Sequence, residues 1–253
     1  MKMHFLDGGR LRMKRRIFVP DAERDETVEL PVISTLFRHA KGNVLFDTGC
    51  HPSVATDARA RWGGMEKFMT PIAPPRQDVI NALAQVGLKP EDIDIVVNSH
   101  LHPDHCGCNA FFTRAQFHCH EAELAAAQAE GADRMGYLRV EWDHPMRLDT
   151  FSGQFDVFGD SRLVTMHLPG HTPGMTGLRA DLTRSGEYFI VSDAVAIERN
   201  LANDEAPMNA WNADLLLASY ETIRARQNAG ATIICGHDDG QWQRLNTGAY
   251  AHD

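Results

Sequence analysis

Cysteine is scarce in this sequence and shows no spacing typical of disulfide frameworks. The chain has five cysteines, an odd number, and no Cys-x-x-Cys pair. A small disulfide-stabilised scaffold and a structural zinc site of the cysteine type are therefore not expected. We expect free thiols at all five positions, which are Cys50, Cys106, Cys108, Cys119 and Cys235.

Long apolar runs are absent as well. No apolar stretch approaches the length that a membrane span needs. The first nine residues lack the extended apolar segment of a secretory signal. These absences predict a protein without a membrane partner and with a cytoplasmic location.

Basic residues are also few relative to acidic ones. The chain has 25 Lys and Arg against 34 Asp and Glu, which gives a formal net charge of −9. Proteins that bind nucleic acid usually neutralise the phosphates with clustered basic residues, so we expect no nucleic-acid partner. The one basic run contains Arg10, Arg12, Lys14, Arg15 and Arg16. We interpret this run as the solvated face of an N-terminal hairpin and assign it no function.

Apolar residues, in contrast, make up 43% of the 253 residues, enough for the core of a single domain over residues 1–253. Short β-branched runs alternate with helical patterns, which predicts an α/β fold. The predicted strands are residues 32–36, 43–46, 93–97, 116–119, 162–167, 187–192 and 232–235. The predicted helices cover residues 78–86, 121–130 and 212–229, the last capped by Asn212. Residues 51–77 show no clear period and are predicted to form a long loop of the binding-lid type.

A dense group of metal-ligand residues follows the predicted strand 93–97. It reads His100-Leu101-His102-Pro103-Asp104-His105 and lies on a loop at the carboxyl end of that strand. His100 and His102 can point the same way from an extended loop, and the Asp104-His105 pair can reach a second ion. Imidazole and carboxylate are ligands that zinc prefers. Cys106 and Cys108 are near enough to approach a metal, but we do not count them as ligands.

Three further candidate ligands also stand directly behind predicted strands. His171 lies in Pro-Gly-His-Thr-Pro-Gly, Asp193 in Ser-Asp-Ala and His237 in Cys-Gly-His-Asp. One such residue alone is commonly structural, but three at strand ends behind the histidine motif predict a site for two zinc ions, with other divalent metals left open. The remaining histidines lack this context and are interpreted as structural, including His118 and His120, which also form a His-x-His pair.

These residues and their spacing resemble the metallo-β-lactamase superfamily over nearly the whole chain, and specifically its quorum-quenching and γ-butyrolactone lactonase branch. Asp47-Thr48-Gly49 and the segment from Ala55-Thr56-Asp57 to Trp62-Gly63-Gly64 are part of the likeness. The resemblance implies an αβ/βα sandwich of two mixed sheets flanked by helices. It also implies two ligand groups joined by a bridging Asp193, the first being His100, His102 and His171 and the second Asp104, His105 and His237.

The same motif separates branches of this superfamily. Class B1 β-lactamases usually lack a histidine where His105 stands, and flavo-diiron proteins usually have a glutamate in place of His102. Glyoxalase II shares the motif, but it anchors its glutathione thioester with a basic, mostly helical C-terminal region, whereas here a short polar tail follows His237. Superfamily nucleases are disfavoured by the acidic net charge.

The predicted activity is the opening of a lactone or small ester, with a small molecule as substrate. A hydroxide bridging two zinc ions attacks the carbonyl, which a zinc ion polarises. Asp104 is the predicted catalytic residue, because a carboxylate next to the nucleophile can pass a proton to the leaving alkoxide. Alternatives within the superfamily are a phosphotriesterase, an arylesterase or a glyoxalase II-like thioesterase. A metal-binding protein without hydrolytic activity and a homodimeric assembly also stay open.

One departure from the lactonase pattern bears on the substrate. Acyl-homoserine lactonases typically have a tyrosine three positions after the bridging aspartate, and this chain has Ala196 there. The missing phenol either leaves room for a bulkier substrate or is replaced by a neighbouring side chain or water. If the room is open, an Ala196→Tyr substitution should raise the turnover of acyl-homoserine lactones.

Overall fold

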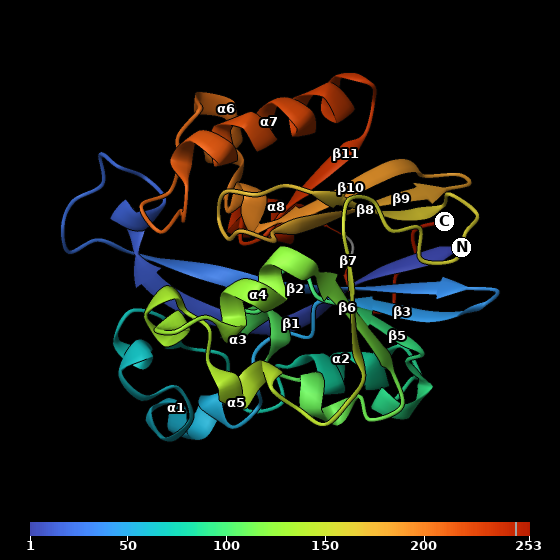
Figure 1. The fold of residues 1–253 in the computed structure, drawn as a ribbon, viewed down its shortest axis with the longest axis horizontal. Helices are drawn as coiled ribbons and strands as arrows, with labels where there is room; N and C mark the ends of the chain where they lie inside the picture. The colour runs from blue at the N-terminus through green and yellow to red at the C-terminus, as the bar shows by residue number, and fades with distance from the viewer. Residues whose placement is uncertain (246) are drawn as a thin grey trace.

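Two β-sheets pack face to face, with helices on their outer surfaces, in the computed structural model, which describes residues 1–245 and 247–253 (Figure 1). The larger sheet has the strand order β4 (Thr70–Pro71), β1 (Lys2–Lys14), β2 (Thr27–His39), β3 (Gly42–Phe46), β5 (Ile95–Val97), β6 (Gln116–His120) and β7 (Leu148–Phe151). The smaller sheet has the order β11 (Thr232–Cys235), β10 (Gly186–Ser192), β9 (Thr176–Leu182) and β8 (Leu163–His167).

Both sheets are mixed, as the family resemblance implies. Antiparallel pairing joins β1, β2 and β3, whereas β3, β5, β6 and β7 run parallel. In the smaller sheet β8, β9 and β10 are antiparallel, and β11 is parallel to β10. The expectation of two mixed sheets flanked by helices is confirmed.

The helices lie on the two outer faces and in the loops between strands (Figure 1). The α-helices are α1 (Val54–Trp62), α2 (Val79–Gln85), α3 (Pro103–Cys106), α4 (Glu121–Gln128), α5 (Arg139–Trp142), α6 (Glu198–Asn203), α7 (Ala213–Asn228) and α8 (Asp239–Arg244). Short 3₁₀ turns are η1 (Arg15–Ile17), η2 (Gly63–Lys67), η3 (Pro90–Asp92), η4 (Asn109–Phe111), η5 (Ala132–Met135) and η6 (Asp193–Val195). Among the described residues, none of these helices is both long and apolar enough to cross a membrane.

Local sequence explains where the central elements begin and end. Val96 and Val97 of β5 are fully buried, as expected for a parallel strand covered on both faces. The Asp78 side chain accepts a hydrogen bond from the Asn81 backbone N–H and so caps α2. Asn212 caps α7 in the same way, as predicted. These strands and caps fix the loops that carry the candidate ligands.

The main core lies between the two sheets. Phe5, Phe37 and Phe46 of the larger sheet are buried in one cluster with Leu178 and Ile190 of the smaller sheet. A second cluster packs α7 onto the smaller sheet, and a third packs α2 onto the larger one. The two sheets are thereby held in a fixed relation, and that relation positions residues from both of them at one site.

The segment 51–77 differs from its prediction. A loop was expected throughout, but residues 54–62 form α1. The helix is held by Glu141, a fully buried carboxylate that accepts hydrogen bonds from Arg61 Nε at 2.8 Å and Trp62 Nε1 at 2.8 Å. Since these partners are about 80 residues apart in the chain, the helix depends on tertiary contacts that periodicity cannot reveal.

The N-terminal hairpin agrees with its prediction. Strands β1 and β2 pair along their length, from Lys2 opposite Arg38 to Lys14 opposite Thr27. Four of the five residues of the basic run form ion pairs with acidic residues, for example Arg12 with Glu29 at 2.7 Å. Exposed pairs of this kind contribute little to stability, at most about 1 kcal/mol each.

Candidate metal centre

The candidate ligands come from loops at the carboxyl ends of strands in both sheets. The motif that begins at His100 follows β5, and its later residues open the short helix α3. His171 follows β8, Asp193 follows β10 and His237 follows β11. The structure therefore brings all seven predicted ligands to one place between the sheets.

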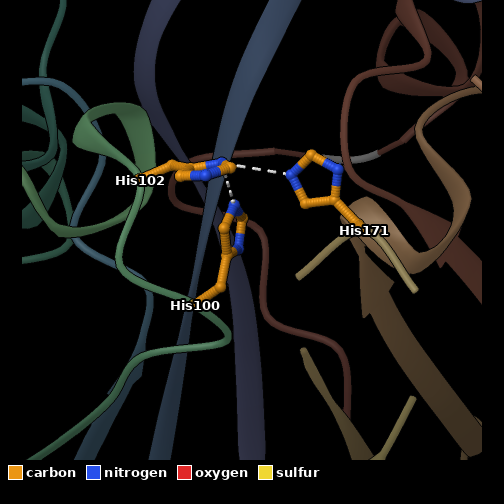
Figure 2. A group of neighbouring side chains, drawn as sticks. All are labelled: His100, His102 and His171. Atoms are coloured by element: carbon orange, nitrogen blue, oxygen red, sulfur yellow. Dashed lines mark hydrogen bonds between the residues drawn. The ribbon is translucent and has the colours of Figure 1, made fainter. Parts of the chain in front are cut away.

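Three imidazoles form the first group. The Nε2 atom of His100 lies 3.1 Å from Nδ1 of His102, and Nε2 of His171 lies 3.1 Å from the same atom. Figure 2 shows the three rings pointing toward one another, with His100 and His102 on one loop and His171 on another. Their nitrogen atoms are close enough to share one metal ion.

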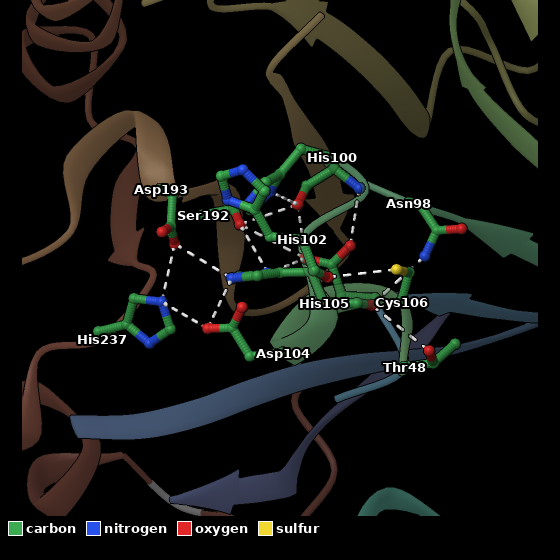
Figure 3. Close-up of polar contacts among 12 residues, drawn as sticks. Thr48, Asn98, His100, His102, Asp104, His105, Cys106, Ser192, Asp193 and His237 are labelled. Atoms are coloured by element: carbon green, nitrogen blue, oxygen red, sulfur yellow. Dashed lines mark hydrogen bonds and ion pairs between the residues drawn. The ribbon is translucent and has the colours of Figure 1, made fainter. Parts of the chain in front are cut away.

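The second group contains Asp104, His105 and His237. The Nε2 atoms of His105 and His237 each lie 3.6 Å from Oδ2 of Asp104. Figure 3 shows the ring of His105 pointing toward Asp104, Asp193 and His237. These three ligand atoms also lie close enough together to hold one ion.

Asp193 stands between the two groups. Its Oδ1 atom lies 3.0 Å from Nε2 of His237 and 3.3 Å from Nε2 of His105. Its other oxygen, Oδ2, lies 3.4 Å from Nε2 of His171 in the first group. One carboxylate thus directs one oxygen to each group, which is the arrangement that a bridging ligand requires.

Hydrogen bonds on the outer side of the rings set the nitrogen that faces inward. His102 directs Nε2 to the Met135 carbonyl at 2.9 Å, and His237 directs Nδ1 to the Pro31 carbonyl at 2.8 Å. A carbonyl can only accept, so these nitrogens carry the proton and the opposite nitrogens offer a lone pair to the centre. Such outer partners orient metal-binding histidines.

A glycine at the end of η5 allows this turn to pack closely against the imidazole of His102. Gly136 adopts a φ of +97°, and a Cβ there would lie 2.8 Å from Nε2 of His102. Any larger residue would be strained in this backbone conformation and would push on the imidazole. The residue is thus needed for η5 to approach His102.

The donor set fits a divalent metal. The site contains imidazoles and carboxylates that are buried, with His102 the more open member. Among the described side chains, His105 Nε2 and Asp193 Oδ1 are buried without a hydrogen-bond partner. Orphaned buried polar atoms are costly, and here they face each other where an ion would satisfy both.

Burial and neighbouring charges shift the pKa values of the candidate ligands. Burial lowers the pKa of His171 to about 3. Although burial opposes the charged form, the carboxylates of Asp104 and Asp193 hold the pKa of His105 well above its usual value. Burial likewise opposes ionisation of Asp193, but His237 and His105 keep its pKa well below the usual range. The negative charge of Asp193 and the raised pKa values of His105 and His237 therefore depend on each other, and a metal ion bound there would take the place of the imidazole protons.

Asp47 is a candidate positioning residue to which the sequence reasoning assigned no role. It lies just after β3 in the unusual left-handed region, at φ 60°. Its carboxylate accepts hydrogen bonds from the backbone N–H and the hydroxyl of Ser99, both at 2.7 Å, and from Nδ1 of His105 at 2.9 Å. Asp47 therefore fixes the ring of a candidate ligand from behind. The sequence feature that could have indicated this role is the polar Asp-Thr-Gly turn directly after a buried strand.

Residues that the sequence reasoning set aside lie outside the ligand groups. The thiol of Cys106 donates to the His102 carbonyl and that of Cys108 to the Cys50 carbonyl. Nδ1 of His120 accepts from the Ala122 backbone N–H, and its ring stacks on that of His167. His118 packs against the Phe155 ring. Each of these side chains has a structural contact in place of a metal-facing one.

Comparison with known proteins places the chain in a family. A family model described as "Metallo-beta-lactamase superfamily" matches residues 27–237 of the chain. The chain belongs to the metallo-beta-lactamase superfamily. Its predicted membership is confirmed.

Relatives and solved structures within this superfamily match nearly the whole chain. It is 27% identical to N-acyl homoserine lactonase AttM of Azorhizobium caulinodans, over 96% of this chain and 95% of that protein. It is 28% identical to an N-acyl homoserine lactonase of a Bacillus species, over 94% of this chain and 93% of that protein. An N-acyl homoserine lactone hydrolase solved with N-hexanoyl-L-homoserine at its metal centre has the same fold, with a TM-score of 0.89 at 24% identity over 99% and 98% of the two chains. The structure of the dizinc lactonase AidC gives a TM-score of 0.72 at 16% identity, over 94% of this chain and 87% of that chain.

Proposed function

We propose that this protein is a dinuclear zinc hydrolase that opens lactones. The observation that carries the proposal is the carboxylate of Asp193, which directs one oxygen to each of two ligand groups. The first ion would be held by His100, His102 and His171 and the second by Asp104, His105 and His237, with Asp193 shared. Zinc at such a site supplies Lewis acidity, which polarises a carbonyl and makes a coordinated water nucleophilic near neutral pH.

Asp104 has the position for proton transfer in this reaction. Its side chain is 7% exposed, and Oδ2 lies the same distance from two imidazoles, those of His105 and His237. Ring opening breaks the bond between the acyl carbon and the ring oxygen, and that oxygen needs a proton to leave as an alcohol. A carboxylate oxygen of Asp104 would accept the proton of the attacking water and return it to the leaving oxygen.

A neighbouring pocket supports a substrate with an apolar group. This pocket of about 310 Å³ is lined by His102 and His171 at the metal centre. The apolar part of its wall consists of Ala126, Ala129, Ala132, Met135, Tyr137, Pro173 and Trp211. Such a wall suits an acyl chain or a hydrocarbon ring. None of the described residues that line it is Lys or Arg, which weighs against the carboxylates of a glutathione thioester.

A substrate panel tests the proposal. We expect the zinc-loaded protein to hydrolyse N-hexanoyl-homoserine lactone and γ-butyrolactone with a higher kcat/KM than an aryl ester, a paraoxon-type triester or a glutathione thioester. Each ring opening yields one carboxylic acid, so a pH indicator in weak buffer follows all the lactones alike. A fully loaded protein that prefers the triester or thioester, or that turns over none of the panel, would contradict the proposal.

Ala196 does not leave an open space in place of the missing phenol. Its side chain is 3% exposed and belongs to a buried apolar cluster with Phe18, Leu30 and Trp62. Its carbonyl accepts a hydrogen bond from the His237 backbone N–H at 2.8 Å. Of the two alternatives raised by the sequence, the structure thus supports filling by neighbouring side chains.

An Ala196→Tyr variant is therefore expected to lose stability. Inserting a large ring into a packed cluster costs about 1 to 3 kcal/mol. We expect a lower midpoint of chemical unfolding and no gain in acyl-homoserine lactone turnover. The matched control is Ala202→Tyr, an exposed position on α6 that should leave the midpoint unchanged. A stable Ala196→Tyr protein with faster lactone turnover would show that the cluster opens for the phenol.

We further propose that residues 1–253 act as one domain and that the protein is cytoplasmic. The core cluster shared by both sheets supports the first point, since neither sheet buries its inner face alone. The five cysteines are buried and free, which suits a reducing compartment. Two further expectations stay predictions from the sequence: the protein has no nucleic-acid partner, and a homodimer is one of its open assembly states.

A further inference from the structure

A buried carboxylate outside the ligand groups connects the loops of the first one. Glu123, on α4, is 0% exposed and forms no ion pair with any described residue. Its Oε1 atom accepts a hydrogen bond from the Leu101 backbone N–H at 2.9 Å. Its Oε2 atom accepts from the Thr172 hydroxyl at 2.7 Å and from the Gly174 backbone N–H at 3.1 Å. Both oxygens are thus occupied by donors from two different loops.

The donors stand beside the candidate ligands. Leu101 lies between His100 and His102, and Thr172 directly follows His171. The two loops that supply the first ligand group, about 70 residues apart in the chain, therefore meet at one side chain. The spacing of the three imidazoles depends on the distance between these loops.

Close packing around Glu123 makes the connection rigid. A Cβ on Gly174 would lie 2.2 Å from the Glu123 backbone nitrogen, so the loop after His171 lies directly against the start of α4. No larger residue fits there. The carboxylate consequently has little freedom to follow either loop independently.

We propose that Glu123 is a positioning residue that sets the spacing between His171 and the pair His100 and His102, and thereby the metal affinity of the first group. The inference rests on the proposed function, because it takes these histidines as zinc ligands. Glu123 touches neither metal nor substrate and acts only through the backbone of the two loops.

A carboxylate is the side chain that this position requires. Glutamine has nearly the same shape but only one acceptor oxygen, and its amide nitrogen is a donor. In either orientation that nitrogen would face the backbone N–H of Leu101 or of Gly174, and neither can turn away. One loop would lose its hydrogen bond and shift, while the Thr172 hydroxyl could rotate to compensate.

Stepwise zinc binding to the metal-free protein tests this role, with a chromophoric chelator as competitor. We expect Glu123→Gln to weaken one of the two binding steps about 10- to 100-fold and to leave the other within about 3-fold, as is typical of residues that orient metal ligands. Glu121→Gln removes the same charge from an exposed position on the same helix and should change neither step. Thr172→Val, which removes one donor to Glu123, should weaken the same step to a smaller extent.

A double-mutant cycle assigns the affected step. Combined with His171→Ala, Glu123→Gln should weaken zinc binding no further, whereas combined with His237→Ala it should keep its full effect. Equal weakening of both steps with a lowered melting temperature would reduce Glu123 to a general structural role and overturn the inference. Unchanged affinities would overturn it as well. A wild-type protein that binds no zinc would refute the proposed function itself, and this inference with it.

Discussion

An Asp193→Ala variant is expected to lose at least about 100-fold in kcat/KM and to retain fewer than two zinc ions per chain, more than the usual effect of residues behind the ligands. The reason is the shared position of this carboxylate, with Oδ1 3.0 Å from His237 Nε2 and Oδ2 3.4 Å from His171 Nε2. Its removal takes a ligand from both groups at once. It also removes the negative charge that offsets two dications in a buried site, where an uncompensated charge is costly.

Metal analysis of the dialysed protein and kinetics with added zinc separate the two parts of this expectation. The control is Asp181→Ala on β9, which removes an aspartate from an exposed position of the smaller sheet. The variant Asp193→Ala should stay below wild-type activity even with excess zinc, because loading cannot restore the shared ligand. Full turnover with two ions bound would rule out the dinuclear assignment.

An Asp104→Asn variant is expected to lower kcat about 100- to 10,000-fold on lactones, with a much smaller change in KM. Asparagine keeps the size of the side chain and one oxygen that can bind a metal, but it cannot accept and return a proton. Asp104 is buried beside His105 and His237, so bulk water has little access to replace it. The loss should therefore appear in the chemical step.

The leaving group provides the internal control for this variant. A nitrophenyl ester releases a phenolate that needs no proton, whereas a lactone releases an alkoxide that does. We expect Asp104→Asn to slow lactone opening far more than hydrolysis of the nitrophenyl ester, at equal zinc content. An equal loss on both substrates would show that protonation of the leaving oxygen does not depend on Asp104, which would then keep only the two roles common to both reactions, metal ligation and proton acceptance from the attacking water.

The candidate ligands could be selected from the sequence because each follows a strand with a clear apolar pattern. Val96 and Val97 are fully buried, and β11 occupies the predicted residues 232–235. A polar side chain directly after such a strand emerges at the sheet edge, where other strands end too. The cap at Asn212 was also readable, because it depends on residues three positions apart.

What the sequence did not reveal depends on contacts between distant segments. Helix α1 has a kink at Asp57 and buries only Val54 and Trp62, so it shows no helical period. Asp47 owes its role to the parallel pairing of β3 with β5, which places it against Ser99, 52 residues away. Glu123 lies in a correctly predicted helix, but its three donors come from two loops that only the folded sheets bring together.

The distribution of ligands over both sheets also bears on how the protein is made. His100 and His237 are 137 positions apart in the chain (237 − 100), and His237 follows β11. At typical rates of synthesis, roughly 7 to 27 s separate the appearance of these two residues at the ribosome. During that interval β8, β9 and β10 appear with His171 and Asp193, but the second ligand group stays incomplete until His237 follows β11. Closure of the metal centre is therefore a late event in biogenesis, set by the docking of the second sheet onto the first.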